Sequence, residues 1–385
     1  MDGDPRHGHT DFTAFDFTAL RRHPDVEAAN LFAHDATDEL LLAELAGADD
    51  GGPLAIVGDR YGALTLAAAH AAPGRDIRVH QDGRVAELAL AANAGRLGLA
   101  GTYRSLPLGA DLLSGAGTVL WQLPRGLDEL DEVAALLAAH ADPGVRVIAG
   151  GRVKHMTPAM NTMLGRYFED VGATRAWRKS RALKAGRPLR PAPPSDFPRR
   201  EYQADLGLWL CAHGGTFAGT RLDIGTRFLL QFADQMRPEA VSAIDLGCGN
   251  GAVAAALAAA RPGLHVTATD QSAQAVASAR ATAAANGLAD RVTAVQDDAL
   301  SGFPAGSADL VVLNPPFHVG ATVHAGIALK LFDAAARVLT PGGELWTVYN
   351  SHLDYRRQLD ERVGPTWVKG GNNKFTVAVS VKTQR

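Results

Sequence analysis

The segment AIDLGCGNGAVAAALAAARPGLHVTATDQ, residues 243–271, carries the pattern that decides the fold. An apolar run ends in a glycine-rich loop, a proline-free, Ala-rich stretch follows, and a second apolar run begins after Gly263. The order strand, glycine turn, helix, strand is that of a β-α-β unit. The segment therefore predicts a doubly wound α/β domain with a mostly parallel sheet.

The same order recurs in the first half of the chain, in AIVGDRYGALTLAAAHAAPGRDIRVHQD at residues 55–82. An ungapped alignment of the two segments pairs three glycines: Gly58 with Gly247, Gly62 with Gly251 and Gly74 with Gly263. A chain of 385 residues is long enough for two domains. We expect a duplicated Rossmann-like domain, with one copy at 1–190 and the other at 191–385; the alternative is chance similarity of two Ala-rich units.

Composition narrows the class of protein. The chain is 46% hydrophobic and 21% charged, its N-terminus is polar, and no run of about 18 apolar residues occurs, so we expect neither secretion nor a membrane span. Its two cysteines, Cys211 and Cys248, lack CxxC partners, and the histidines lack ligand spacing. We therefore expect a cytoplasmic protein without a metal site; its oligomeric state stays open, and a monomer is compatible with the sequence.

Acidic residues mark the ends of three successive strands in the second half. Asp245 precedes the glycine loop, Asp270 ends the next strand, and Asp297 and Asp298 end a third. The spacing of the loop, Asp-x-Gly247-x-Gly249-x-Gly251, differs from the dinucleotide fingerprint G-x-G-x-x-G. Ligands bind at the carboxyl edge of such sheets. We expect the glycines to admit a ligand, Asp270 to accept from ribose hydroxyls, and the acids of the third strand to accept from an adenine amino group.

The fourth strand stops abruptly in VVLNPPFHVG, residues 311–320. Proline cannot continue a sheet ladder, so the Asn314 side chain and the Pro315 carbonyl are left at the edge as acceptors. Together with the ring of Phe317 they suit a planar amino group attached to an aromatic ring. Hydrogen bonds that strengthen as the nitrogen pyramidalises would accelerate its reaction. His318 is adjacent, and we interpret it as structural and not as a base.

These motifs resemble class I S-adenosylmethionine-dependent methyltransferases of the small-domain group. The resemblance is carried by DLGCGNG, the strand-end acids and NPPFH; the duplicated layout, the loop GGTFAGTRLDIGTRFLL and the tail NNKFTVAVSVK look most like the large-subunit members of the ribosomal RNA guanine-N2 methyltransferases. The resemblance implies a seven-stranded sheet with its last strand antiparallel. It also implies that Phe217 and Asp223 lie over the cofactor. Asp245 departs from the pattern, since many members have Glu there.

The activity implied is transfer of a methyl group from S-adenosylmethionine to the exocyclic N2 of a guanine in large-subunit (23S) rRNA. Small-subunit (16S) rRNA, adenine N6 and protein glutamine remain alternatives, because N-P-P-aromatic serves all planar amino nitrogens. Two other classes of protein fit the motifs less well. A nicotinamide oxidoreductase gives no reason for N-P-P-F, and a non-catalytic RNA-binding assembly factor would not need three strand-end acids.

The first copy lacks the residues that carry these motifs in the second copy. Arg60 aligns with Gly249, Gln81 aligns with Asp270, and WQLPR at 121–125 stands where the second copy has LNPPF. We therefore expect the first domain to bind no cofactor and to dock RNA, with a purely structural role as the alternative.

Residues 175–200, RAWRKSRALKAGRPLRPAPPSDFPRR, carry nine basic residues and one acid. Their second half holds five prolines, which suits a semi-rigid linker. We expect four residues of this segment, here called the basic quartet, to contact RNA phosphates: Arg178, Lys179, Arg181 and Lys184. A solvated connector is the alternative. GGRVKHM, from Gly150, is a further candidate for phosphate contacts.

Overall fold

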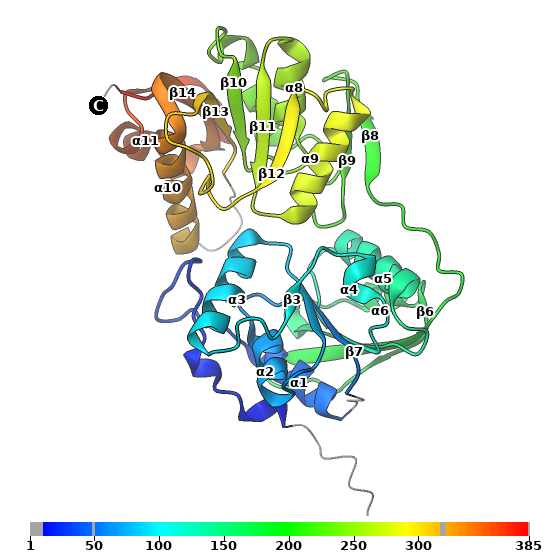
Figure 1. Ribbon diagram of the computed structural model, residues 1–385. Coiled ribbons are helices and arrows are strands. Elements are labelled where there is room, and N and C mark those ends of the chain that lie inside the picture. The colour runs from blue at the N-terminus through cyan, green and yellow to red at the C-terminus, as the bar shows by residue number, and fades with distance from the viewer. Residues whose placement is uncertain (1–10, 48–50, 316–320, 384–385) are drawn as a thin grey trace, which may run out of the picture. The chain divides into compact units, whose positions relative to one another are not determined.

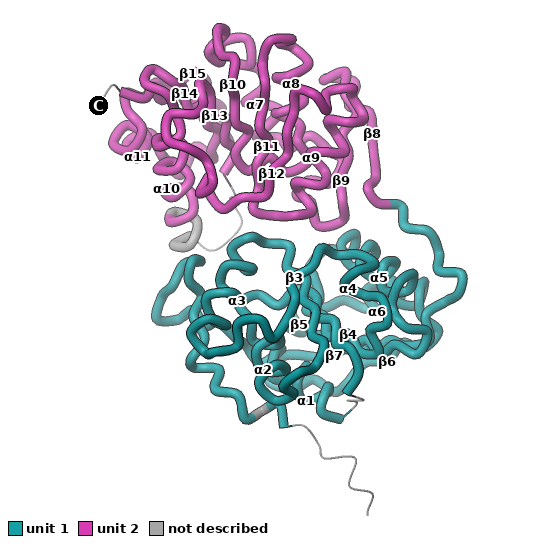
Figure 2. Tube along the Cα trace, in the orientation of Figure 1, with its two compact units in different colours: residues 1–196 teal, residues 197–385 magenta. Residues whose placement is uncertain are grey.

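The computed structural model describes residues 11–47, 51–315 and 321–383. The chain forms two compact units, Met1–Asp196 and Phe197–Arg385 (Figure 2), each of which is described by itself. The division falls after residue 196, whereas the sequence placed it after residue 190.

Each unit is built on a seven-stranded sheet (Figure 1). The first sheet is made of β1 (Leu54–Val57), β2 (Ile77–His80), β3 (Arg104–Ser105), β4 (Thr118–Gln122), β5 (Arg146–Arg152), β6 (Phe168–Ala173) and β7 (Ser180–Pro188). The helices of this unit are α1 (Ala36–Ala46), α2 (Ala63–Ala71), α3 (Arg84–Arg96), α4 (Ala110–Leu113), α5 (Leu127–His140) and α6 (Pro158–Leu164), with short 3-10 turns η1 (Phe12–Ala14), η2 (Phe17–Ala19) and η3 (Val153–His155).

The second unit repeats this plan. Its sheet is made of β10 (Ser242–Leu246), β11 (His265–Asp270), β12 (Val292–Gln296), β13 (Ala308–Leu313), β14 (Leu339–Asn350), β15 (Thr366–Gly371) and β16 (Phe375–Val381), and β8 (Arg199–Gln203) pairs separately with β9 (Leu208–Ala212). The helices are α7 (Ile224–Leu230), α8 (Ala252–Ala260), α9 (Ala273–Ala285), α10 (Ala321–Val338) and α11 (Arg356–Arg362), with η4 (Ala233–Gln235) and η5 (Ser351–Leu353).

The two sheets have the same strand order, β3-β2-β1-β4-β5-β7-β6 and β12-β11-β10-β13-β14-β16-β15. In each, the first five strands of the order run parallel, and the sixth is antiparallel to both of its neighbours. The antiparallel last strand implied by the sequence, β16, is therefore present. The second unit is thus an α/β fold with a mixed sheet.

Alternating residues of the central strands face opposite layers of helix. In β10, Ala243 packs in the core beneath α8 and α9, whereas Ile244 and Leu246 pack in the core beneath α10 and α11. Strands covered on both faces are mostly apolar, which explains the apolar run of β1 and the apolar residues on either side of Asp245 in β10. Among the described residues, no helix combines the length and hydropathy that a bilayer span requires.

The basic segment is not a linker over its whole length, as the sequence had suggested. Residues 180–188 form β7, which lies between β5 and β6 and buries Ala182 and Leu183. The prolines follow: Pro188 ends the strand, and irregular chain continues to β8. The basic side chains obscured the alternation of buried and exposed residues that marks this stretch as a strand.

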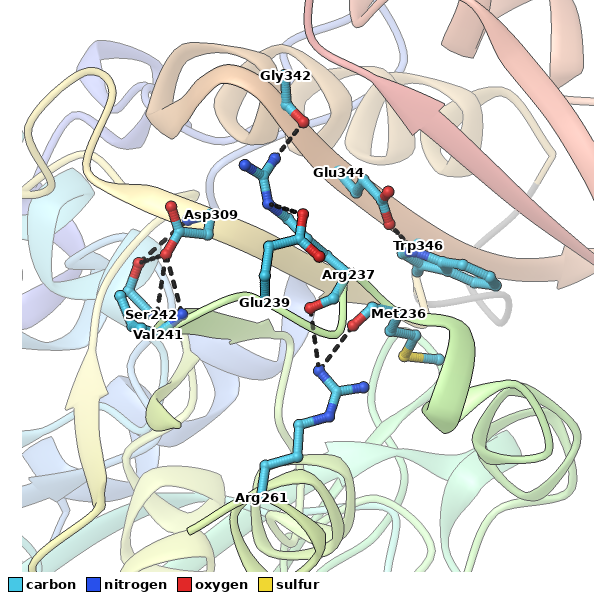
Figure 3. A network of polar contacts seen from close by, with 10 residues as sticks. All are labelled: Met236, Arg237, Glu239, Val241, Ser242, Arg261, Asp309, Gly342, Glu344 and Trp346. Carbon is cyan, nitrogen blue, oxygen red and sulfur yellow. Dashed lines mark hydrogen bonds and ion pairs between the residues drawn. The ribbon is translucent and has the colours of Figure 1, made fainter. Parts of the chain in front are cut away.

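A polar network closes the amino-terminal edge of the second sheet (Figure 3). One Asp309 oxygen, at the start of β13, accepts from the Val241 and Ser242 amides at 3.2 and 3.1 Å and from the Ser242 hydroxyl at 2.9 Å, which joins β13 to β10. Arg261 donates to the Met236 carbonyl at 2.7 Å. These bonds tie β13 to the start of β10 and α8 to the segment that precedes β10.

Candidate cofactor and substrate site

The predicted site residues gather at the carboxyl edge of the second sheet. The adjacent strands β12, β11, β10 and β13 end in Asp297, Asp270, the glycine loop and Asn314 (Figure 1). Because these strands are parallel neighbours, the fold brings together residues that lie up to 69 positions apart in the sequence, from 245 to 314. Each side chain has its own partners there.

The glycines of the loop serve two different purposes. Gly247 and Gly249 have φ angles of 76° and 52°, and a Cβ on either would meet no atom within 4 Å. These two positions therefore face open space that a ligand can occupy. A Cβ on Gly251 would instead lie 2.8 Å from the Cα of Ala279, so this glycine allows α8 to pack closely against α9.

Asp270 is fixed against the loop by two backbone amides. One carboxylate oxygen accepts from the Gly249 amide at 3.1 Å and the other from the Ser272 amide at 3.0 Å. The carboxylate is thus held beside the open face of the loop, as acceptance from a pair of ribose hydroxyls requires.

Asp245 is buried beneath the loop and accepts from the Ala254 amide at 3.0 Å. Burial raises the pKa of this carboxyl to about 7, against the lowering effect of the Ala254 hydrogen bond and with a further increase from the negative charge of Asp270. Near neutral pH the carboxyl is thus shared between its two protonation states. A cationic group bound nearby would favour the ionised state.

A loop that precedes α7 is tied to the glycine loop. The Asn250 side chain donates to the carbonyls of Gly219 and Arg221 at 2.9 and 3.0 Å. These bonds hold residues 219–221 against the glycine loop. Phe217, which is exposed, lies two residues before this anchored segment. The predicted position of Phe217 over a cofactor fits this anchoring and stays a prediction.

The Asn314 amide is held in one orientation by two acceptors. Its Nδ2 donates to Asp223 Oδ2 and to Thr226 Oγ1, both at 3.0 Å. A carboxylate can only accept, so the NH₂ end of the amide must face Asp223. Oδ1 consequently points elsewhere: it is buried and has no hydrogen-bond partner among the described residues.

The sequence did not foresee the contact between Asp223 and Asn314. The resemblance placed Asp223 over the cofactor, whereas here it caps α7 through the Thr226 amide and binds the Asn314 amide. Thr226 was missed altogether. Only the Asp-x-x-Thr spacing before an apolar helix pointed to a cap, and nothing local linked this cap to a strand 88 residues away.

The residues that follow Asn314 and the two acids that follow β12 differ in their contacts. Pro315 is buried directly after Asn314. Phe317 and His318 lie outside the described residues. Asp297 accepts from the Ser301 and Gly302 amides at 2.6 and 2.9 Å, and Asp298 forms an ion pair with Lys330 at 2.6 Å. A role of the two acids in holding adenine therefore stays a prediction.

At the corresponding loop of the first unit, the helix N-terminus is closed from within. The buried Asp59 accepts from the amides of Gly62 and Thr65 at 3.1 and 2.8 Å and from the Thr65 hydroxyl. Gln81, which aligns with Asp270, donates to the Ala86 carbonyl at 3.0 Å and to the Asp59 carbonyl. These internal bonds occupy groups that would have to meet a cofactor.

The basic quartet is only partly available to a ligand. Arg178 pairs with Glu39 at 3.0 Å and Lys184 with Glu44 at 2.6 Å, both acids being on α1. Arg181 is partly buried on β7, and Lys179 is exposed. The segment that is most basic in sequence is thus half neutralised in the fold.

Comparison with known proteins agrees with this geometry. Residues 9–188 match the RLMG N-terminal domain family, and residues 207–379 match the methyltransferase small domain family. Ribosomal RNA large subunit methyltransferase G of Pseudomonas paraeruginosa is 37% identical over 369 residues, covering 95% of this chain and 97% of the relative. The Streptomyces coelicolor protein of the same name is 38% identical, covering 94% and 97%.

A solved T. thermophilus 16S rRNA N2 methyltransferase, in complex with AdoMet and guanosine, has a TM-score of 0.75 and 22% identity to this chain. The match covers 91% of this chain and 92% of that one, and shows that the two share a fold. The relatives at 37–38% identity extend over nearly the whole sequence and decide the family. The chain belongs to the ribosomal RNA large subunit methyltransferase G family, as the resemblance in its sequence predicted.

Proposed function

We propose that the chain transfers a methyl group from S-adenosylmethionine to the exocyclic N2 of a guanine in large-subunit rRNA. The observation that carries this proposal is the buried Oδ1 of Asn314, an acceptor locked in place beside the glycine loop with no partner among the described residues. A buried acceptor without a partner is costly unless a ligand satisfies it. An amino group supplies the missing donor.

The residues at the loop fit S-adenosylmethionine. Gly247 and Gly249 leave room for its backbone-like portion, the Asp270 carboxylate suits its ribose, and Asp245 suits its ammonium group. When bound, this cofactor supplies an electrophilic methyl group. The tasks left to the protein are to hold the amine in line with that methyl group and to exclude water.

The Asn314 oxygen and the Pro315 carbonyl would accept the two hydrogens of the guanine amino group. Their pull is strongest when the nitrogen becomes pyramidal and positive, so they favour the transition state over the ground state. The proton becomes acidic once the nitrogen carries the charge, and a strongly basic side chain is not required. Phe317 would stack on the base, which must leave its RNA stack to enter the site.

We infer that the first unit is a decayed Rossmann-like copy of the second, serving to dock RNA. The identical strand order supports this, as do α2 and α8, which start after Gly62 and Gly251 with left-handed φ angles of 95° and 76°. The domains would then correspond to residues 1–190 and 191–385. A purely structural first domain is the alternative.

The direct test incubates the protein with labelled methyl donor and each purified rRNA, followed by nucleoside analysis. We expect N2-methylguanine in large-subunit rRNA, formed most readily on RNA free of ribosomal proteins. Label confined to small-subunit rRNA would refute the choice of subunit. Label recovered as N6-methyladenine, or transferred only to protein, would refute the choice of amine.

A further inference from the structure

The first unit has a cavity of about 520 Å³ at the carboxyl ends of β1, β4 and β5. Its lining includes Gly58 of the first glycine loop, Gln122 at the end of β4, and Gly151 in β5. Basic side chains from three separate segments also line it: Arg60, Arg125, Arg152, Lys154 and His155. The cavity thus occupies, in the first unit, the edge of the sheet that holds the candidate site in the second.

The positive charge of this lining is poorly compensated. Of the two acids in the lining, Asp35 lies 3.6 Å from Arg60 and pairs with it. Burial, followed by the charges of Asp82 and Glu132, raises the pKa of the other acid, Glu129, to about 7, so it is only partly ionised at neutral pH.

The three remaining cations, Arg125, Arg152 and Lys154, form no ion pair within residues 11–47, 51–315 and 321–383. They also stand near one another. The pKa of His155 is lowered first by burial and then by the charges of Arg125, Lys154 and Arg152. Like charges gathered without counter-charges destabilise a fold, and an anionic ligand would relieve that repulsion.

Two of these cations stand at positions where the second unit opens to its ligands. Arg60 aligns with Gly249 of the glycine loop, and Arg125 aligns with Phe317. S-adenosylmethionine carries a sulfonium and an ammonium group against a single carboxylate, so its net positive charge disfavours binding to this lining. A chain of phosphates would instead be attracted, and the volume exceeds what a single phosphate fills.

We propose that this cavity binds backbone phosphates of the substrate RNA, through Arg125, Arg152 and Lys154. The proposal rests on the proposed function, because it takes RNA as the substrate. It places three phosphate contacts of the first unit in the cavity, in addition to those expected of Lys179 and Arg181, because the other two members of the basic quartet are paired with acids of α1.

The test compares two triple variants of the full chain that lose the same charge. The first is R125Q/R152Q/K154Q. The control is R84Q/R104Q/R187Q, which removes three exposed arginines that pair with Glu87, Asp76 and Asp170 outside the cavity. Binding of a labelled, unstructured 20-nucleotide RNA is measured across a range of salt concentrations, and far-UV circular dichroism with thermal unfolding reports that both variants are folded.

Each phosphate contact to single-stranded RNA contributes about 0.7 to the slope of log K against log salt. Loss of three contacts should flatten the slope by about 2. If the variant and the wild type bind equally at 1 M salt, the variant should then bind roughly 100-fold more weakly than the wild type at 0.1 M salt. The control should keep the wild-type slope. Equal slopes for the cavity variant and the wild type would overturn the proposal.

Two further measurements locate the contact and identify its source. RNA carrying 4-thiouridine should cross-link to the peptides around residues 122–125 or 151–156 in the wild type, and cross-links found only elsewhere would overturn the proposal. Inorganic phosphate and guanosine monophosphate are titrated calorimetrically. Binding of either that is lost in the cavity variant, with an unchanged RNA slope, would assign the cavity to a small phosphate ligand and overturn the RNA proposal.

Methyl transfer by the wild type to purified rRNA separates this proposal from the proposed function. If the wild type methylates no rRNA, the proposed function fails. If it methylates rRNA while the cavity variant keeps the wild-type salt slope, only the cavity proposal fails.

Discussion

Replacing Asn314 by alanine should separate chemistry from cofactor binding. The substitution removes the buried Oδ1 acceptor and the two 3.0 Å bonds that Nδ2 donates to Asp223 and Thr226. Loss of one preorganised polar group at a reacting centre typically costs about 100- to 1000-fold in kcat, or roughly 3–4 kcal/mol. Loss of the two donated bonds should lower the free energy of unfolding by about 1–3 kcal/mol.

Thr226 allows the positioning of the amide to be tested without removing the acceptor. Thr226→Val deletes one of the two groups that orient Asn314, and we expect single-turnover methyl transfer to fall by about tenfold because the amide can rotate out of line. Thr226→Ser keeps the hydroxyl and should restore most of the rate. A purely structural role would instead lower stability in Thr226→Val without this selective recovery.

The assay for the Asn314 and Thr226 substitutions is single-turnover methyl transfer to purified large-subunit rRNA. S-adenosylhomocysteine affinity is measured on the same preparations by calorimetry. In Asn314→Ala the rate should fall by about two orders of magnitude or more, while that affinity changes by less than about twofold. Parallel losses of rate and affinity would refute the reasoning, because they would mean that Asn314 acts on the cofactor.

Three other predictions concern cofactor count, pH and the basic quartet. Calorimetry should find one S-adenosylmethionine site per chain, abolished by Asp270→Ala and unaffected by Gln81→Ala; two sites would mean that Arg60 does not block the first loop. The pKa of about 7 for Asp245, above its ordinary 3.8, means that the folded state holds an extra proton between about pH 4 and 7. This stabilisation is complete below pH 4 and declines by about 1.4 kcal/mol per pH unit as the pH rises to 7. Chemical denaturation from pH 5 to 8 should therefore show a free energy of unfolding that falls with pH, and Asp245→Asn should remove this dependence. An unchanged pH dependence in the variant would contradict the assignment. Changing the whole basic quartet to serine should flatten the salt dependence of RNA binding by about 1–2 units, since Arg178 and Lys184 are paired with Glu39 and Glu44; a change of 3 to 4 units would show that RNA displaces both acids.

The parts of the fold that were predictable are those set by short sequence distances. The glycine loop, the helix that follows it and the second strand lie within one 29-residue segment, residues 243–271, and the structure contains them as β10, α8 and β11. Asp270 and Asn314 were found because the ends of parallel strands share one edge of the sheet.

The parts that were not predictable depend on partners far away in the chain. The contact of Asn314 with Asp223 spans 91 residues, and neither residue type reveals it. Likewise β7 was hidden because its basic side chains dominate the composition, while the features that make it a strand are ladders to β5 and β6. Spacing rules describe one element at a time, and these features belong to pairs of elements.

The location of the basic surface also depends on pairs of elements and could not be predicted from charge counts alone. Counting charges along the sequence singles out residues 175–200, yet a charge can attract RNA only to the extent that the fold leaves it uncompensated. Arg178 and Lys184 meet acids of α1. The cavity cations, which form no ion pair among the described residues, come from the segment around Arg125, which has no charge run, and from GGRVKHM, which the sequence named only as a further candidate. The topology brings these segments together because β4 and β5 are parallel neighbours, so their carboxyl ends open onto one edge. In this protein a basic surface is therefore a product of strand order, and its location must be sought at sheet edges before it is sought in charge runs.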